Sequence, residues 1–308
     1  MAETARPSAW PALRVDEWTD TRELLHLWSQ IVGKLRLAAE PMLNHWWQVA
    51  LYVSAHGLTT GVLHDRAGAL ELELDLIDHV LRIRTDHRSD LELALASGSV
   101  AEFHARVTGA LRELGSGLEI LPVPMELEVA VPFGEDRAHR EYDPDHAHRF
   151  WRQLLAADRV LKRFRGEFAG KSSPVHFFWG SFDMAVTRFS GRPAPRHPGG
   201  APHCPDWVMV EGYSHELTSC GFWPGGGEEG AFYAYAYPEP DGFREAAVEP
   251  EGAFYEPALG QFLLPYELVR GAPDPDSAVL GFLRDTHRAA AERAGWDPGL
   301  DYVPVPHD

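Results

Sequence analysis

Residues 171–192 form the segment KSSPVHFFWGSFDMAVTRFSGR, which mixes side chains that can do chemistry with aromatic side chains that build a core. His176 and Asp183 can exchange protons or bind a metal ion, and an ordinary core strand needs neither of them. On one regular extended strand the two side chains face opposite sides, unless Gly180 bends the backbone. Glycine tolerates such a bend, so His176 and Asp183 can share one pocket in an apolar wall, and the sequence leaves open whether they converge.

A second segment, EGYSHELTSCGFWPGG at residues 211–226, offers another histidine beside another carboxylate. His215 and Glu216 are adjacent, so on a regular strand only one of them faces a given pocket. Together the two segments give the predicted catalytic residues His176, Asp183, His215 and Glu216.

Three interpretations of this set are open. Two histidines and a carboxylate on neighbouring strands suit a divalent metal such as iron or zinc, and the ligands would be His176, His215 and Glu216. Without a metal, His215 can form an acid/base pair with Glu216 or Asp183. In the third interpretation, the histidines hydrogen-bond to buried backbone or to the neighbouring carboxylates and only tie two strands together. No spacing in the sequence is diagnostic of one of these roles.

Basic and aromatic side chains surround these candidates. Arginine and lysine hold carboxylates or phosphates by charge-assisted hydrogen bonds, and aromatic rings commonly line ligand pockets. The alternative for the basic residues is salt bridges on the surface with the many acidic side chains. The predicted substrate-binding residues are Lys171, Trp179, Arg188, Arg192, Tyr213 and Trp223.

The composition narrows the classes of partner. The 308 residues include 28 Lys plus Arg and 46 Asp plus Glu, and the net charge of -18 repels phosphate backbones, so nucleic acid is not expected. No apolar run approaches the roughly 20 residues of a membrane-spanning helix, so no membrane association is expected. The two cysteines lack the spacing of a metal or redox motif and fit a reducing compartment. We therefore expect a cytoplasmic protein with a small-molecule ligand, and its oligomeric state is left open.

Apolar residues recur at helical spacing in four segments, which predicts helices over residues 20–40, 100–114, 144–168 and 276–295. Asp20 and Glu23 have the spacing of a capping box at the start of the first helix. Residues 45–133 contain alternating apolar runs that predict an antiparallel sheet, including strands in LEILPVP and MELEVAVPF at 118–133. Strands resume after the third helix and are interrupted by a long loop rich in proline and glycine at 193–205.

These elements predict an α+β fold of two similar halves, each an antiparallel sheet with packed helices, arranged as an internal duplication around a central groove. The expected boundaries are an N-terminal half at 1–135, a connecting amphipathic helix at 136–170 and a C-terminal half at 171–308. A constant shift along the chain also places Ser54, His56 and Thr60 over Ser181, Asp183 and Thr187. The groove between the halves is the expected pocket.

Four stretches of the chain carry a resemblance to a known family: NHWWQVALYVSAHGLTT, KSSPVHFFWGSFDMAVTRFSGR, YSHELTSCGFWPGG and AFYAYAYPEP. They resemble the signature stretches of a bacterial family known as domain of unknown function 5996, and the likeness runs from Trp10 to Trp296. The resemblance implies kinship but no activity, cofactor or catalytic residue. From the residues themselves we expect a small-molecule enzyme, with a metal-dependent oxygenase or hydrolase as one version. The alternative is a non-catalytic protein that binds a small ligand in an aromatic pocket.

Overall fold

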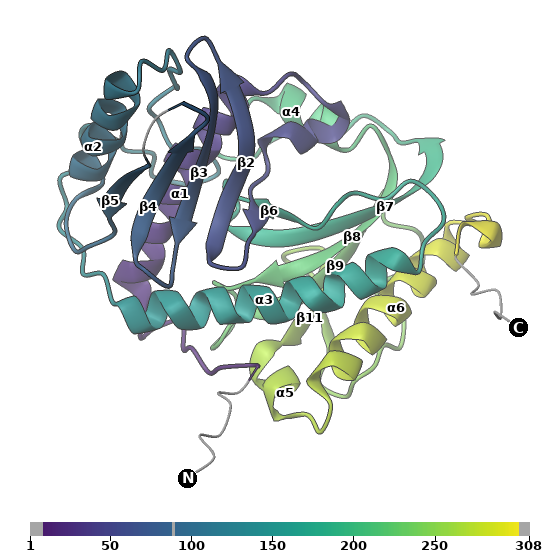
Figure 1. Cartoon of the computed structure of the whole chain (residues 1–308). Coiled ribbons are helices and arrows are strands. Elements are labelled where there is room, and N and C mark those ends of the chain that lie inside the picture. Colours follow the sequence, from purple (N-terminus) through teal and green to yellow (C-terminus); the bar gives the residue numbers. More distant parts are fainter. Residues whose placement is uncertain (1–8, 88–89, 302–308) are drawn as a thin grey trace, which may run out of the picture.

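Two antiparallel sheets form the framework of the α+β fold, as the sequence predicts (Figure 1). The computed structural model of the chain describes residues 9–87 and 90–301. The first sheet has the order β1-β2-β3-β4-β5, with β1 (Tyr52–Val53), β2 (Gly57–Asp65), β3 (Gly68–Asp75), β4 (Val80–Thr85) and β5 (Leu91–Ala94). The second has the order β10-β11-β9-β8-β7-β6, with β6 (His176–Phe178), β7 (Asp183–Pro193), β8 (His215–Trp223), β9 (Ala231–Tyr237), β10 (Phe254–Glu256) and β11 (Gln261–Pro265).

Helices cover these sheets. They are α1 (Thr19–Ala39), α2 (Val100–Glu113), α3 (Pro144–Gly166), α4 (Asp206–Gly212), α5 (Tyr266–Gly271) and α6 (Pro275–Arg293), with the short 3-10 helices η1 (Asn44–Val49) and η2 (Pro298–Leu300). Helices α1, α2, α3 and α6 confirm the four that helical spacing predicts. Within the described residues, every helix is too short or too polar to cross a membrane.

The capping box predicted at the start of α1 is wrong. The helix begins after Trp18, whose side chain makes no capping hydrogen bond. The Asp20 carboxylate instead accepts the backbone N–H of Glu141 at 3.0 Å, and the Glu23 carboxylate pairs with Arg140 at 2.9 Å. Both acids therefore hold the chain that leads into α3 against the first turns of α1.

The two halves repeat one order of elements. In the first half, α1 leads into the four-stranded antiparallel meander β1–β4, and β5 and α2 follow. In the second half, α3 leads into the meander β6–β9, and β11 and α6 follow. The first strands of the two meanders meet through Leu51 and Phe177, whose backbone groups exchange two hydrogen bonds of 2.9 Å. The order and pairing of the strands thus support the two similar halves expected from the sequence, and the second half adds α4, β10 and α5.

The residue-by-residue match between the halves differs from the expected one. The last paired positions of the first hairpins are Val53 with Leu58 in one half and Phe178 with Asp183 in the other. Asp183 therefore occupies the place of Leu58, whereas the constant shift along the sequence matches it to His56. A polar side chain in the second half thus stands where the first half has a core leucine.

Helix α3 joins the halves into one apolar core, and Figure 1 shows it crossing beneath both sheets. Asp143 starts the helix, because its carboxylate accepts two backbone N–H groups of the first turn at 2.8 and 3.2 Å. The ring of Phe150 lies 5.1 Å from Trp18 of the first half and 5.2 Å from Phe182 of the second. The same face of one helix is therefore buried by both halves.

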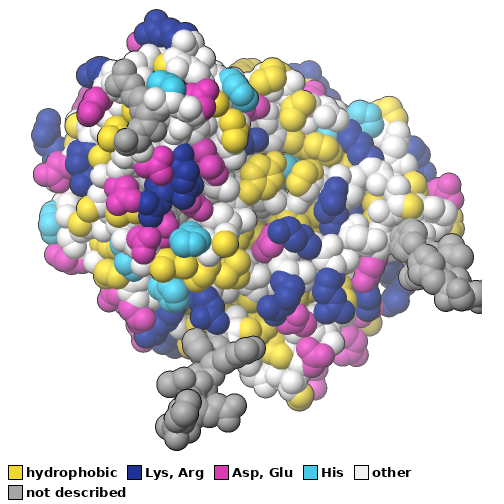
Figure 2. Space-filling view, in the orientation of Figure 1, with side chains coloured by type: hydrophobic (Ala, Val, Ile, Leu, Met, Phe, Trp, Pro, Cys, Tyr) yellow, Lys and Arg dark blue, Asp and Glu magenta, His cyan; other side chains and the backbone are white. Residues whose placement is uncertain are grey.

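The first sheet has an apolar face and a polar face, because apolar and charged residues alternate along its strands. Strand β3 buries Leu72 and Leu74, while Glu71 and Glu73 point to the other side, where Arg84 contacts Glu73 at 2.8 Å. Figure 2 shows basic and acidic side chains intermingled over this part of the surface.

The second sheet is covered on both faces. On one face α3 and α6 pack against it: Thr218 shares a hydrogen bond of 2.8 Å with His287, and the guanidinium of Arg188 lies 3.5 Å from the centre of the Phe164 ring. The opposite face forms the floor of a cavity, which is covered by α1, η1, α4 and an irregular segment at 119–126.

The strands predicted at 118–133 are absent, and this prediction is wrong: the segment is irregular throughout. Pro122, Pro124 and Pro132 each lack a backbone donor and interrupt any ladder of hydrogen bonds. The long loop predicted at 193–205 is confirmed after β7, and it leads into the short helix α4.

Replacing Phe177 with alanine should lower the free energy of unfolding by about 3 to 5 kcal/mol, because its fully buried ring packs where the two sheets meet. Phe254→Ala is the matched control: it makes the same chemical change at a ring that is 45% exposed and should cost less than about 1 kcal/mol. Urea denaturation of both variants measures the difference. Equal losses would contradict a core shared at this junction.

Candidate functional site

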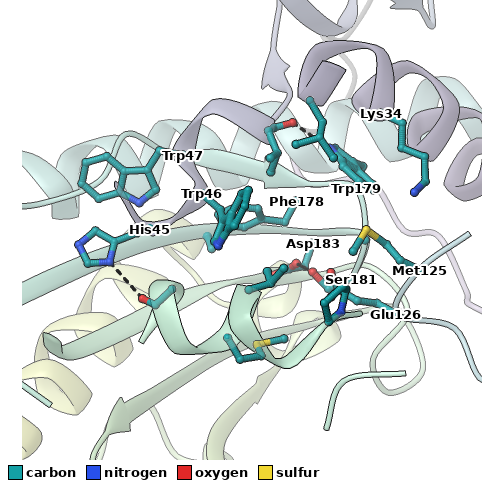
Figure 3. A pocket seen from close by; sticks show the side chains of 18 of the residues that line it. Lys34, His45, Trp46, Trp47, Met125, Glu126, Phe178, Trp179, Ser181 and Asp183 are labelled. Carbon is teal, nitrogen blue, oxygen red and sulfur yellow. Dashed lines mark hydrogen bonds between the residues drawn. The ribbon is translucent and has the colours of Figure 1, made fainter. Parts of the chain in front are cut away.

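A cavity of about 650 Å³ lies between the two halves (Figure 3). The first half contributes α1, η1 and the segment at 119–126, and the second half contributes β6 to β9 and the chain around α4. The floor is one face of the second sheet, where Asp183, Ala185, Thr187 and Phe189 alternate along β7. A partly open cavity therefore lies where the sequence predicts a groove between the halves.

Nine aromatic residues line the cavity, together with aliphatic and polar side chains. Trp46 and Trp207 lie with their ring centres 4.9 Å apart, and the indole N–H of Trp179 donates to the Val49 carbonyl at 2.8 Å, which fixes that ring. Lining aromatic residues are Trp46, Trp47, Phe178, Trp179, Phe189, Trp207, Tyr213, Tyr233 and Tyr235. Such walls favour a flat, largely apolar molecule.

Asp183 is a buried carboxyl group on the floor of the cavity. The hydroxyls of Ser181 and Tyr233 donate to its two oxygens. Burial raises the pKa of Asp183, and these two hydrogen bonds oppose the rise. The pKa of Tyr233 is raised well above its ordinary value, mainly by burial, so its hydroxyl remains a donor at neutral pH.

Glu126 is the second carboxyl group, and it opens onto the same cavity. Among the described residues its carboxyl has no hydrogen-bond or ion-pair partner, although its backbone N–H donates to Pro202 at 2.7 Å. Burial, and then the charge of Asp183, raises the pKa of Glu126 to about 7. A side chain at Gly180 would overlap the Glu126 carboxyl, so glycine at this turn leaves the space that the carboxyl occupies.

One turn of α1 holds the segments that carry these two acids. The buried side chain of Gln30 donates to the Met125 carbonyl and accepts the Met125 N–H, both at 2.9 Å. One turn earlier, Nε2 of His26 bonds to the Gly180 carbonyl at 2.9 Å. The residue before Glu126 and the turn before Asp183 are therefore tied to the same helix.

Backbone strain gathers around the cavity. Left-handed φ values are rare for residues other than glycine. In the described chain they occur at His45, Trp46, His79, Glu126, Phe182 and His203. All except His79 either line the cavity or, in the case of Phe182, lie between two lining residues. Such clusters are typical of functional sites.

Two basic side chains, Lys34 and His45, line other walls of the cavity, and Lys171 contacts His45 from outside the lining. Lys34 projects from α1 with Nζ 5.6 Å from the centre of the Trp179 ring, and burial lowers its pKa. His45 has its Nδ1 against the Gly212 carbonyl at 3.2 Å, while its Nε2 lies 2.7 Å from Nζ of Lys171. Nδ1 therefore carries the proton of a neutral ring, and Nε2 accepts from the lysine.

Asp183, Trp179 and Tyr213 are the predicted site residues that line the cavity. His176 lies on the same face of the sheet, because it pairs with Ala185, but aromatic rings enclose it and it is absent from the lining. Its neighbours are Trp47, Tyr52 and Phe178. Burial, and then nearby arginines, lowers its pKa to about 3, so it stays neutral. The turn at Gly180 thus brings Asp183 into the cavity without His176.

His215 and Glu216 lie on opposite sides of β8, as alternation requires. His215 stands beside His45, with ring centres 5.7 Å apart. Glu216 faces away and contacts Arg192 at 2.7 Å and Ser190 at 2.9 Å.

The predicted iron or zinc ligands His176, His215 and Glu216 are therefore not assembled. Within residues 9–87 and 90–301, one group of three potential metal ligands comes together, and it lies at the first sheet. It consists of His56, Asp75 and Asp78, whose ligand atoms lie within 4.8 Å of one another. Asp75 there is already bonded to Arg82 and to two backbone N–H groups.

The remaining predicted substrate contacts lie outside the cavity lining. Arg188 is buried on the helical face of the second sheet, where it donates to the Phe164 carbonyl. Arg192 pairs with Glu216, which matches the surface salt bridge considered as the alternative role. Lys171 donates to His45, and Trp223 ends β8 and packs against Gly226.

Glu126, Lys34 and Tyr233 line the cavity but are missing from the predicted set. Glu126 lies in MELEVAVPF, whose alternation indicates a surface strand. The signal against a strand is the preceding PVP, because two prolines so close together favour an irregular backbone. Lys34 looks like an ordinary charged position on an amphipathic helix.

Comparison with known proteins identifies the family. The chain matches the model of a family of unknown function, DUF5996, over residues 10–300, and it belongs to that family. Neither a curated protein nor a solved structure gave a significant match.

The pH dependence of the free energy of unfolding should show the raised pKa of Glu126. Its pKa is about 7 in the folded protein against an ordinary 4.5, so between these values the folded protein binds more protons than the unfolded chain. Its contribution to stability therefore falls as pH rises from about 4.5 to about 7 and is level above that.

Chemical denaturation of the wild type and Glu126→Gln across this range isolates the contribution. The wild-type advantage in unfolding free energy should shrink by about 2 to 3 kcal/mol as pH rises. A difference that does not change with pH would contradict the raised pKa. Glu128→Gln, two residues away and exposed, should give no such trend.

Proposed function

We propose that this member of the DUF5996 family is an enzyme that acts on a small, largely apolar molecule, with Glu126 as the group that donates and accepts protons. The observation that carries the proposal is a carboxyl group with a pKa of about 7, without a hydrogen-bond or ion-pair partner among the described residues, at the end of an aromatic cavity. Catalytic acids and bases work best when their pKa is near the working pH. Structural carboxylates are more often paired with a cation or bonded to backbone N–H groups.

Asp183 is the partner of Glu126 in this mechanism. Hydrogen bonds from Ser181 and Tyr233 occupy both of its oxygens and favour its ionised form. Burial raises the pKa of Glu126 most, and the charge of Asp183 adds to the rise. Glu126 can thus take a proton from a substrate and return it at another atom.

The walls of the cavity support the same function. A volume of about 650 Å³ suits a molecule the size of a typical metabolite. A bound molecule that displaces water from these walls strengthens the electrostatic interactions at the two carboxyl groups. The clamps from Gln30 and His26 keep both acids in place.

Incubation with a small-molecule extract, followed by mass spectrometry, tests catalysis without a known substrate. The wild type should consume one compound and form another, and Glu126→Gln should do so at least about 100-fold more slowly. Trp fluorescence should show that the variant still binds the compound, since four tryptophans line the cavity. Glu128→Gln should behave as the wild type, and undiminished turnover in Glu126→Gln would overturn the proposed role.

A non-catalytic ligand-binding protein is the second candidate, and the large aromatic share of the cavity walls favours it. In this case the same incubation retains a compound on the wild type with saturable Trp quenching, and the compound is recovered unchanged. Glu126→Gln then changes affinity alone.

A further inference from the structure

The cavity presents charged groups in two places, and neither place has a partner of opposite charge in the described chain. One is the pair Glu126 and Asp183, and the other is the ammonium group of Lys34. Lys34 comes from α1, Asp183 from the floor of the cavity, and Glu126 from the segment at 119–126 beside it (Figure 3). No carboxylate of the described residues lies within 4.0 Å of its Nζ, so the lysine does not neutralise the acids.

The acid end is arranged to receive a positive charge. Asp183 already accepts hydrogen bonds at both oxygens, so it serves as an acceptor and not as a donor. Glu126 has free acceptor sites facing the cavity. When both acids are ionised, two neighbouring negative charges are costly without a cation, and a protonated amine would satisfy them with charge-assisted hydrogen bonds.

The lysine end is arranged to receive a negative charge. Lys34 is 6% exposed, and its nearest aromatic contact is the Trp179 ring at 5.6 Å. A lysine ammonium has three donors, and an aromatic ring replaces only part of their lost hydration. A carboxylate or phosphate on a bound molecule would supply the missing acceptors.

We propose that the substrate is an amphoteric molecule whose protonated amine contacts Glu126 and Asp183, whose acidic group contacts Lys34, and whose apolar body lies between the aromatic walls. This inference rests on the proposed function, because it assigns the substrate class of the same cavity. It accounts for both unpaired charges with one ligand. An amine alone leaves Lys34 unsatisfied, and an acid alone leaves the carboxyl pair without a cation.

A set of aromatic probe molecules with different charges tests the proposed substrate class. The zwitterions are L-phenylalanine and 4-(aminomethyl)phenylacetate, which differ in the separation of their charges. The single-charge probes are phenethylamine and 3-phenylpropionate, and Nile red is the neutral probe. Titrations at about pH 8 keep Glu126 mainly ionised. At least one zwitterion should bind about tenfold or more tightly than either single-charge probe.

Two variants remove the charges one at a time. Glu126→Gln should weaken the better zwitterion and phenethylamine about tenfold while leaving 3-phenylpropionate unchanged. Lys34→Met should weaken the zwitterion and 3-phenylpropionate while leaving phenethylamine unchanged or stronger. Lys162→Met and Glu128→Gln change exposed charges and should alter none of the affinities.

The outcomes separate this inference from the proposed function. If Nile red binds but neither zwitterion exceeds the single-charge probes, the cavity binds ligands and the amphoteric assignment is wrong. If affinity follows only one charged end, the other half of the assignment is wrong. If no probe binds, Nile red included, both the assignment and the proposed small-molecule site fail.

Discussion

One turn of α1 fixes the relative position of the two carboxyl groups, and the rest of the site depends on it. Gln30 holds both backbone groups of Met125, and His26, four residues earlier on the same helix, holds the carbonyl of Gly180. Glu126 directly follows Met125, and the turn that contains Gly180 leads to Asp183. Burial raises the pKa of Glu126 most, and the charge of Asp183, held nearby by these contacts, adds to the rise. The left-handed backbone at Glu126 is a further sign that packing imposes this geometry.

The repeated architecture explains why the cavity lies where it does. Both halves use the same order of helix, meander, strand and helix, but they treat the equivalent position differently: the first half places Leu58 in its core, and the second places Asp183 in the cavity. Helix α3 and the junction of Leu51 with Phe177 join the halves into one core. The second sheet is thereby left with α3 and α6 on one face and with parts of the first half on the other. The cavity is the space between that face and those parts.

The periodicity of apolar residues predicts most of the helices and strands but few of the residues that line the cavity. The four long helices and the hairpin of β3 and β4 follow from regular apolar spacing, which reports local burial directly. Asp183, Trp179 and Tyr213, which the sequence predicts as site residues, do line the cavity, and they lie on strands or turns next to a dense aromatic segment. Glu126 was missed, since its segment alternates like a strand while its prolines prevent one.

The sequence also makes His176 and His215 look more like site residues than the structure does, because local spacing does not show which side chains surround them. The register that puts His176 on the cavity face does not reveal the rings that enclose it, and these come from η1 and β1 as well as from its own strand. The separation of Glu216 from His215 follows from alternation alone. The partners of Arg188 and Lys171 come from α3 and η1, far away in the sequence, and could not be read from local spacing.

Direct titration of Glu126 is the measurement on which the account depends most. Carbon-13 labelling of glutamate side chains, with the Glu126 signal assigned by its absence in Glu126→Gln, gives the pKa by NMR. The account predicts a pKa of about 7 in the wild type and a lower value in Asp183→Asn, where the repelling charge is gone but burial remains. A Glu126 signal that titrates near the ordinary 4.5 in both proteins would contradict it.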